Sequence, residues 1–314
     1  MDGQPWVEKY RPKRFSEIVL DDTNKLIFKN ILKKRYFPNL LLYGPPGTGK
    51  TTTIINIINK YQELTNSKNK DLIIHLNASD DRGVDIVRNQ INQFVNTKTL
   101  FNNGLKFIIL DEVDYMTKNA QSALRYLIQQ YSDNIRFCLI CNYISRIDTA
   151  LQNEFVRLKF CNLPKNQIIN FLKKIIYKEN ININEKKIEG IQNIFNSDIR
   201  SMINFLQSNS NFINEQTFNI ISNDFWEILI EDYFKKNDNI QETKEFIKKS
   251  CFEYNIRTKN FIVKFITYLI HNKTYTLNRK WIDTLQMIIH HVETDNNEII
   301  LSYCILALVD LYKS

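Results

Sequence analysis

The sequence predicts an α/β protein in which a parallel sheet occupies the first half of the chain and helices occupy the second. Short apolar runs alternate with amphipathic segments up to about residue 160, as in strands joined by crossover helices. After Pro164 the pattern is helical, with Asn-rich segments between the helices. A glycine-rich stretch, YGPPGTGKTTT at residues 43–53, lies between a predicted strand and a predicted helix, the order that a phosphate-binding loop requires.

The predicted strands are short runs of mostly apolar residues: Leu40–Tyr43, Leu72–Leu76, Phe107–Asp111, Phe137–Cys141 and Val156–Phe160. A helix follows the glycine-rich stretch and carries Ile54, Ile57, Ile58 and Tyr61 at helical spacing. Another helix is predicted from about Asn119 to Tyr131, with Thr117 as its N-cap. The apolar run Ile299–Val309 predicts a helix that must be covered on most sides, either by its own domain or by another subunit.

Composition limits the classes of function. The chain has 314 residues, 43% of them hydrophobic, which is enough for two or three folded domains. Its formal net charge of +8 favours a polyanionic partner but does not require one. Cys138 and Cys141 lie inside an apolar run without a second ligand pair, so we expect buried strand residues and no structural metal. No run is long enough to span a bilayer, and we expect no membrane partner.

The glycine-rich stretch fits the pattern G-x-x-x-x-G-K-[ST] at Gly44, Gly49, Lys50 and Thr51. Backbone amides and the lysine of such a loop bind the phosphates of a nucleotide, and the threonine hydroxyl binds Mg²⁺. We therefore expect ATP and Mg²⁺ as cofactors. The residues predicted to contact ATP in this loop are Gly44, Pro45, Pro46, Gly47, Thr48, Gly49, Lys50, Thr51 and Thr52.

A second part of the site is predicted at the end of the strand in FIILDEVD, where Asp111 and Glu112 follow four apolar residues. Asp111 would hold Mg²⁺ together with Thr51, and Glu112 would activate the attacking water. A strand that merely ends in acids is the alternative. DEVD is also similar to an RNA helicase box, but a second α/β lobe would then be expected after Leu163. One phosphate-binding domain followed by a helical lid is instead the arrangement of AAA+ proteins.

Four stretches taken together resemble the small subunits of replication factor C, the clamp loader that places a sliding clamp on primed DNA. They are PWVEKYRP from Pro5, LNASDDRGVDIVR from Leu76, LDEVDYMTKNAQSALR from Leu110 and RFCLICNYIS from Arg136. The resemblance continues as NSDIRSMINFLQ from Asn196 and becomes faint in the C-terminal part. The run TKTLFNNGLKFIILDE is most similar to the small subunit at the centre of the eukaryotic five-subunit arc.

The resemblance implies an AAA+ P-loop ATPase domain at residues 1–162, a helical lid at 163–223 and a helical collar for oligomerisation at 224–314. It implies an ATPase subunit that uses ATP binding and hydrolysis to open the clamp and load it on DNA. The implied partners are the other subunits of a hetero-pentamer, the sliding clamp (PCNA) and a primed single-strand/double-strand DNA junction, and the implied location is the nucleus. A nucleotide-binding scaffold subunit without efficient hydrolysis is the alternative, and a different AAA+ machine, such as a branch-migration motor with closed six-fold rings, is a second one.

The resemblance also assigns roles to single residues. Catalytic roles fall on Glu112, on Lys50, on Asn142 at the sensor-1 position and on Arg200 at the sensor-2 position. Tyr10, Arg11 and Pro12 match the segment that lies over the adenine. Asn77 matches the polar residue that holds the catalytic glutamate inactive until DNA binds, although a capping or surface role is the alternative.

Two further pairs match surfaces that contact partners. Arg82 and Arg88 match positions that face DNA, and arginines suit phosphate contacts without base reading. Two solvated arginines near a helix start are the alternative. Leu100 and Phe101 match the place where the family's ATPase domains touch the clamp, and a buried anchor for the following strand is the alternative.

The sequence departs from the family where a Ser-Arg-Cys triplet supplies an arginine to the neighbouring subunit's site. Asn153, Glu154 and Phe155 replace this triplet, so an acid stands at the arginine-finger position. Arg157 is the nearest possible substitute and Arg146 a weaker one. The hypothesis is that this subunit hydrolyses ATP, whereas the site that it borders binds ATP without efficient turnover.

Overall fold

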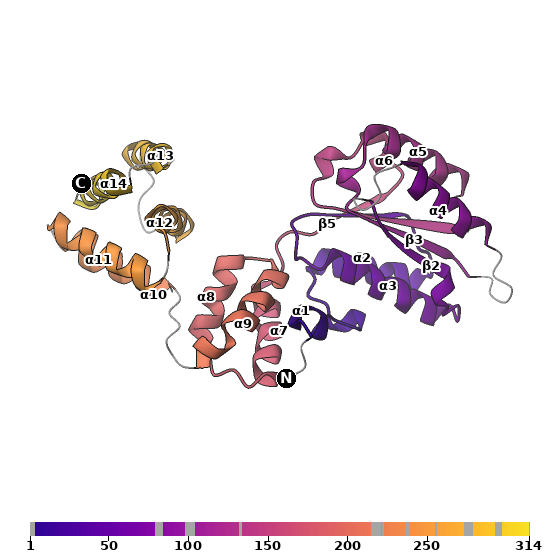
Figure 1. Cartoon of the computed structure of the whole chain (residues 1–314), viewed down its shortest axis with the longest axis horizontal. Coiled ribbons are helices and arrows are strands. Elements are labelled where there is room, and N and C mark those ends of the chain that lie inside the picture. Colours follow the sequence, from indigo (N-terminus) through magenta and orange to yellow (C-terminus); the bar gives the residue numbers. More distant parts are fainter. Residues whose placement is uncertain are drawn as a thin grey trace. The chain divides into compact units, whose positions relative to one another are not determined.

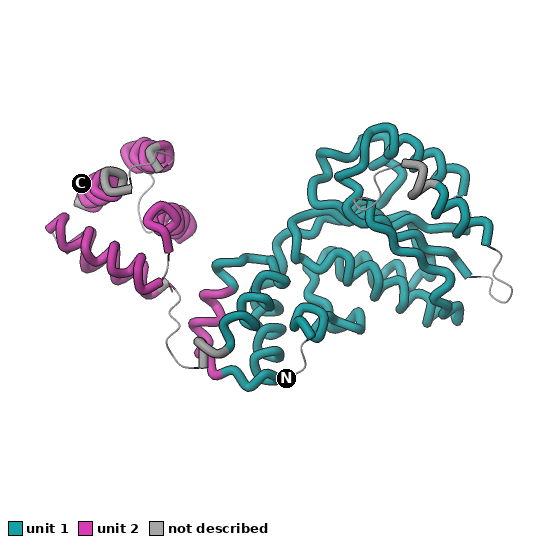
Figure 2. The backbone as a smooth tube through the Cα atoms, viewed as in Figure 1, with its two compact units in different colours: residues 1–181, 192–210 teal, residues 182–191, 211–314 magenta. Residues whose placement is uncertain are grey.

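The computed structural model describes residues 4–78, 84–97, 104–131, 134–214, 221, 223–236, 239–254, 256–272, 279–292 and 297–313. These residues form two compact units (Figure 2). Unit 1 comprises residues 1–181 and 192–210, and unit 2 comprises residues 182–191 and 211–314. The two units are groups of residues in contact, whereas the sequence predicts three functional domains divided at residues 163 and 224. That division stays a prediction.

Unit 1 is built on one parallel sheet (Figure 1). Its strand order is β2-β3-β4-β1-β5. The strands are β1 (Leu40–Tyr43), β2 (Ile73–Asn77), β3 (Lys106–Asp111), β4 (Ile135–Cys141) and β5 (Val156–Lys159). The predicted fold class is therefore confirmed, and each predicted strand boundary lies within two residues of the observed one. In register, Tyr43 is opposite Cys141 and Asn77 is opposite Asp111, so the carboxyl ends of these strands form one edge.

Helices cover both faces of this sheet, with α2 and α3 on one side and α4, α5 and α6 on the other (Figure 1). Their bounds are α2 (Asp22–Lys34), α3 (Lys50–Leu64), α4 (Val84–Asn96), α5 (Lys118–Gln130) and α6 (Thr149–Gln152). Successive side chains of a strand point to opposite faces. Accordingly, Phe107 packs with the α2 and α3 side, whereas Ile108 packs with the α4 and α5 side.

Local sequence signals explain where several helices begin. The Thr117 side chain accepts a hydrogen bond from the Ala120 N–H and caps α5, as predicted, and Asp21 caps α2 in the same way. The sequence interpretation did not identify α2, the short α1 (Trp6–Lys9) or α4. Unit 1 also contains α7 (Lys165–Lys178) and most of α9 (Ile199–Asn214), which follow the sheet in the chain. Four short turns, η1 (Phe15–Glu17), η2 (Lys70–Leu72), η3 (Val113–Tyr115) and η4 (Ile144–Arg146), connect the larger elements.

Every secondary-structure element among the described residues of unit 2 is a helix. Unit 2 contains part of α8 (Glu185–Phe195), then α10 (Asn223–Ile228), a π-helical segment η5 (Leu229–Lys235), α11 (Ile240–Glu253), α12 (Thr258–Asn272), α13 (Arg279–Val292) and α14 (Asn297–Lys313). A core rich in aromatic side chains joins the helices from α10 to α14, and within it the Trp226 ring contacts the rings of Phe261 and Phe265.

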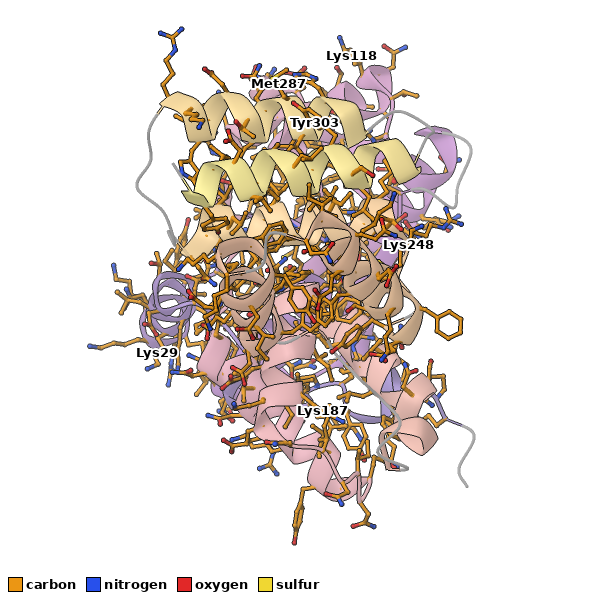
Figure 3. The ribbon with its side chains drawn as sticks, turned by 90° about the vertical axis from the view of Figure 1, so that its left-hand side faces the viewer. Lys29, Lys118, Lys187, Lys248, Met287 and Tyr303 are labelled. Atoms are coloured by element: carbon orange, nitrogen blue, oxygen red, sulfur yellow. The ribbon has the colours of Figure 1, made fainter. Side chains whose placement is uncertain are left out.

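The apolar helix predicted at Ile299–Val309 is part of α14. Leu301, Cys304, Ile305, Leu308 and Leu311 are buried within unit 2. The Tyr303 hydroxyl of α14 lies 3.7 Å from the Met287 sulfur of α13, and these two helices lie beside each other (Figure 3). Leu306 remains 51% exposed, so its own unit covers this helix on most sides but not on all. Among the described helices, none is both long and apolar enough to cross a bilayer.

Candidate functional site

The glycine-rich loop connects β1 to α3, and its glycines have conformations that favour glycine. Gly44, Gly47 and Gly49 have φ angles of 142°, 72° and 85°. At Gly44 a Cβ atom would lie only 1.7 Å from the Phe160 carbonyl oxygen, so no side chain fits there. The loop delivers the N-terminus of α3, where backbone N–H groups without helical partners favour an anion.

A cavity of about 260 Å³ lies above this loop, at the carboxyl edge of the sheet. Most of the predicted ATP-site residues line it: Tyr10, Arg11, Pro12, Pro46, Gly47, Thr48, Gly49, Lys50, Thr51, Thr52, Asp111, Glu112, Asn142 and Arg200. Gly44 and Pro45 do not line the cavity. Their carbonyl oxygens instead accept hydrogen bonds from the Lys50 ammonium group, at 2.7 and 2.9 Å.

Lys50 is buried at the bottom of the cavity, and only neutral oxygens accept its hydrogen bonds among the described residues. Besides the two carbonyls, the Asn142 side-chain oxygen accepts a hydrogen bond from Nζ at 3.0 Å. Burial lowers the pKa of Lys50, although the charge of Asp111 opposes this effect. A buried cation without a directly bonded anion favours the entry of a negatively charged group. The loop and Lys50 therefore fit a phosphate chain.

Thr51 and Asp111 form the second part of the site, where α3 meets the end of β3. The Thr51 hydroxyl donates to the Asp111 carboxylate at 2.7 Å, and the Glu112 N–H donates to its other oxygen at 2.9 Å. Burial raises the pKa of Asp111, but hydrogen bonds with His75, Thr51 and the Glu112 N–H outweigh it and lower the pKa overall. An ionised carboxylate beside a hydroxyl fits Mg²⁺, which takes few protein ligands and completes its shell with water and phosphate oxygens.

Glu112 follows β3 and lines the cavity with an unusual backbone conformation. Its φ of 57° and ψ of 35° lie in the left-handed region, which is uncommon for residues other than glycine. Such strain often accompanies function, because the surrounding structure must enforce it. Asn77 ends the neighbouring strand β2, opposite Asp111 in register, so it lies one position from Glu112 along the edge of the sheet.

Arg200 lies in the first turn of α9, and this helix is attached directly to the glycine-rich loop. The Ile199 N–H donates to the Gly47 carbonyl at 3.1 Å. Asp198 caps α9 by accepting a hydrogen bond from the Ser201 N–H at 3.0 Å, and a Cβ on Gly47 would lie 1.7 Å from its Oδ1 atom. The sequence interpretation missed Asp198, although an Asp just before a helical pattern is an N-cap signal.

The segment Tyr10–Pro12 is held from two sides. The Arg11 guanidinium donates to the Thr52 hydroxyl at 3.2 Å, and Asn56 donates to the Pro12 carbonyl at 3.0 Å. The Tyr10 hydroxyl donates to Glu179, the residue after α7, and the Lys9 ammonium group lies 2.6 Å from the same carboxylate. Glu179 carries no sequence signal for this role, because its partners lie far away in the chain.

Some predicted contact residues lie outside what the structure describes. Arg82, Leu100 and Phe101 are outside the described residues. Arg88 lies in α4, but its side chain is not among those described. Their proposed DNA and clamp contacts therefore stay predictions.

Glu154, at the position where the family has an arginine, faces α5. Its carboxylate accepts a hydrogen bond from Gln129 at 2.7 Å and one from the Arg125 guanidinium at 3.4 Å. Arg157 lies in β5 and donates to the Gln152 side chain at 3.4 Å. The Arg146 guanidinium lies over the ring of Tyr143, 5.0 Å from its centroid.

Comparison with known proteins gives matches to both the domain and the longer chain. The family described as ATPase family associated with various cellular activities (AAA) matches residues 40–163. Replication factor C subunit 5 of Mus musculus is 41% identical over 204 residues, which are 65% of this chain and 60% of that protein. Replication factor C subunit 3 of Saccharomyces cerevisiae is 38% identical over 207 residues, 66% of this chain and 60% of that protein. Each match thus spans less than two thirds of the relative's length.

A solved structure supports the fold. The structure titled Thermotoga maritima RuvB Holliday junction branch migration motor has a TM-score of 0.53 and 15% identity, covering 86% of this chain and 93% of that chain. At this identity the likeness concerns the fold alone. It agrees with a parallel-sheet domain followed by helices.

The contact between Thr51 and Asp111 leads to a prediction about Mg²⁺. We expect Mg²⁺ to tighten binding of the slowly hydrolysed analogue ATPγS to the native chain. Asp111→Asn should reduce this gain by at least roughly tenfold, because one charged ligand is lost. Titrations with Mg²⁺ and with EDTA measure the gain. Asp148→Asn, at an exposed N-cap of α6, is the matched control and should keep the gain in affinity that Mg²⁺ causes. An equal gain in Asp111→Asn would place the metal elsewhere.

Proposed function

We propose that this chain, which is similar to the replication factor C small subunits and matches the AAA ATPase family, is an ATPase subunit of a sliding-clamp loader. In this proposal, ATP binding and hydrolysis drive the opening of the clamp and its loading on primed DNA. The observation that carries the proposal is the convergence of Lys50, Asp111, Glu112, Asn142 and Arg200 on one cavity.

Each of these residues has a proposed role in ATP binding or hydrolysis. Lys50 and the N–H groups at the start of α3 bind the β- and γ-phosphates. Mg²⁺ held by Thr51 and Asp111 would neutralise phosphate charge. Glu112 orients the attacking water and accepts its proton, a role typically worth ~10²–10⁴ in rate. Asn142 contacts the γ-phosphate or the water.

Arg200 contributes through its place on α9. Because Ile199 and Asp198 contact Gly47, the glycine-rich loop and the first turn of α9 are physically connected. A guanidinium in that turn can bind the γ-phosphate and report whether it is present. We infer that nucleotide binding is communicated to α9 through this connection.

The proposed partners are those that similarity to the replication factor C subunits implies, and the positive net charge of the chain is compatible with them. They are the other subunits of a hetero-pentamer, the sliding clamp and a primed DNA junction, in the nucleus. A net charge of +8 suits contact with DNA phosphates. We propose residues 163–223 as the lid and residues 224–314 as the collar, where the exposed Leu306 of α14 would contact another subunit.

The alternative is a scaffold subunit that binds ATP and does not hydrolyse it efficiently. The observation that favours it is the replacement of the family triplet by Asn153, Glu154 and Phe155. The position of Glu112 in the cavity counts against it. A scaffold would have no use for a glutamate held in a strained backbone conformation beside the phosphate site.

The contacts of Glu154 bear on whether this subunit can supply an arginine finger to the ATP site of its neighbour. An arginine finger is worth ~10³–10⁵ in rate, or roughly 4–7 kcal/mol. Glu154 cannot supply this, because a carboxylate repels phosphate, and its hydrogen bonds with Gln129 and Arg125 hold it against α5. We therefore propose that this subunit hydrolyses ATP in its own site, while the site that it borders binds ATP with slow turnover.

The first prediction from the proposed function tests hydrolysis at this site. In the assembled complex with clamp and primed DNA, Glu112→Gln should lower the number of ATP molecules hydrolysed in a single turnover by one per assembly, because this site would slow by ~10²–10⁴. ATP binding should persist, since Gln has the same shape. Glu63→Gln, in an exposed pair on α3, is the control and should hydrolyse normally. An unchanged number for Glu112→Gln would favour the scaffold.

The second prediction concerns the altered triplet. Glu154→Arg should speed hydrolysis at the bordered site, up to the ~10³–10⁵ that a finger contributes. Glu154→Gln removes the charge without adding a guanidinium, and it should give no comparable gain. The measurement is ATP turnover by the assembly with each of these variants and with Arg157→Ala. The hypothesis is wrong if Glu154→Arg changes nothing and Arg157→Ala abolishes turnover.

A further inference from the structure

Asp114 is a buried acid beside the site to which no step of the proposed reaction assigns a role. It lies in η3, directly after the strand end that carries Asp111 and Glu112, and it is only 5% exposed. Its Oδ2 atom accepts two hydrogen bonds at 3.2 Å, from the backbone N–H groups of Asn142 and Tyr143. Its Oδ1 atom is buried and has no hydrogen-bond partner among the described residues.

These two hydrogen bonds join the ends of neighbouring strands. Asn142 and Tyr143 are the first residues after β4, whereas Asp114 belongs to the turn after β3. One carboxylate oxygen thus fixes the backbone from which the Asn142 side chain extends. That side chain in turn meets the Lys50 ammonium group at 3.0 Å. Asp114, Asn142 and Lys50 therefore form a continuous series of contacts that ends at the phosphate site.

A buried carboxylate with one unpaired oxygen is a costly way to hold a loop. The arrangement therefore calls for a role beyond closing the turn, and the position of Asn142 provides one. The Asn142 side chain accepts a hydrogen bond from the buried Lys50 ammonium group. The two hydrogen bonds that Asp114 accepts fix the backbone that carries this side chain.

We propose that Asp114 is the positioning residue that sets Asn142 against Lys50 and thereby allows the site to distinguish ATP from ADP. This inference rests on the proposed function, because it assumes that Asn142 contacts the γ-phosphate or the water beside it. Asp114 itself does not line the cavity. Its effect is transmitted through the backbone of Asn142.

The inference makes a specific statement about affinity. ADP lacks the γ-phosphate, so its binding depends on the glycine-rich loop and only weakly on the position of Asn142. ATPγS has the third phosphate and depends on both. Loss of Asp114 should therefore reduce the preference for ATPγS over ADP, whereas a general weakening of the fold would lower both affinities together.

The test is a measurement of ATPγS and ADP affinities on the full chain by fluorescent-nucleotide competition. Asp114→Ala should lower the affinity ratio by roughly tenfold, the factor expected for losing about one hydrogen bond to a charged group. Asp114→Asn keeps an oxygen that can accept hydrogen bonds from both N–H groups. Its affinity ratio should therefore lie between those of Asp114→Ala and the native chain. Asn24→Ala removes a buried side chain that bonds the Lys159 carbonyl outside the cavity, and it should leave the ratio unchanged.

A double-mutant cycle separates positioning from a structural role. In an Asn142→Ala background, Asp114→Ala should cause no further loss of the ratio, because the side chain that it positions is absent. The inference is overturned if the two losses add, or if Asp114→Ala weakens ATPγS and ADP equally. If Asn142→Ala alone leaves the ratio unchanged, then the proposed role of Asn142 is wrong and the inference fails with it.

Discussion

The buried ammonium group of Lys50 is the interaction on which the rest of the site depends. Two loop carbonyls and the Asn142 side chain surround it, so its charge is held in place without a directly bonded anion among the described residues. The fold makes this possible, because the parallel sheet brings the ends of β1, β3 and β4 to one edge, and the glycine-rich loop follows β1 there. A phosphate chain would supply the missing negative charge, and Asp111 and Asn142 also line the cavity that it would enter.

The same edge of the sheet joins the phosphate site to parts of unit 1 that are distant in sequence. Gly47 contacts the start of α9, which carries Arg200, and Thr52 contacts Arg11 in the N-terminal segment. Glu179, after α7, holds that segment through Tyr10 and Lys9. The cavity is thus connected by contacts to helices before and after the sheet. The proposal that ATP acts as a signal rests on these contacts.

Sequence alone predicted the sheet and the glycine-rich loop at its edge, because both depend on local patterns. Apolar runs and a fixed glycine spacing are visible in the chain, and Thr117 was recognised as a cap from its neighbours. Asp114, Asp198 and Glu179 were not assigned, since their partners are backbone groups and side chains contributed by other elements. The orientation of the Glu154 side chain could not be predicted from the sequence either, because its hydrogen-bond partners, Gln129 and Arg125, lie on a separate helix.

The most direct measurement is ATP turnover by the purified assembly with clamp and primed DNA, comparing the native chain with Lys50→Ala. Lys68→Ala, whose side chain is 71% exposed at the surface, is the control. The account predicts a substantial loss of turnover for Lys50→Ala and none for the control, because this site hydrolyses ATP. Unchanged turnover with the assembly intact would contradict it and would make ATP here a structural ligand.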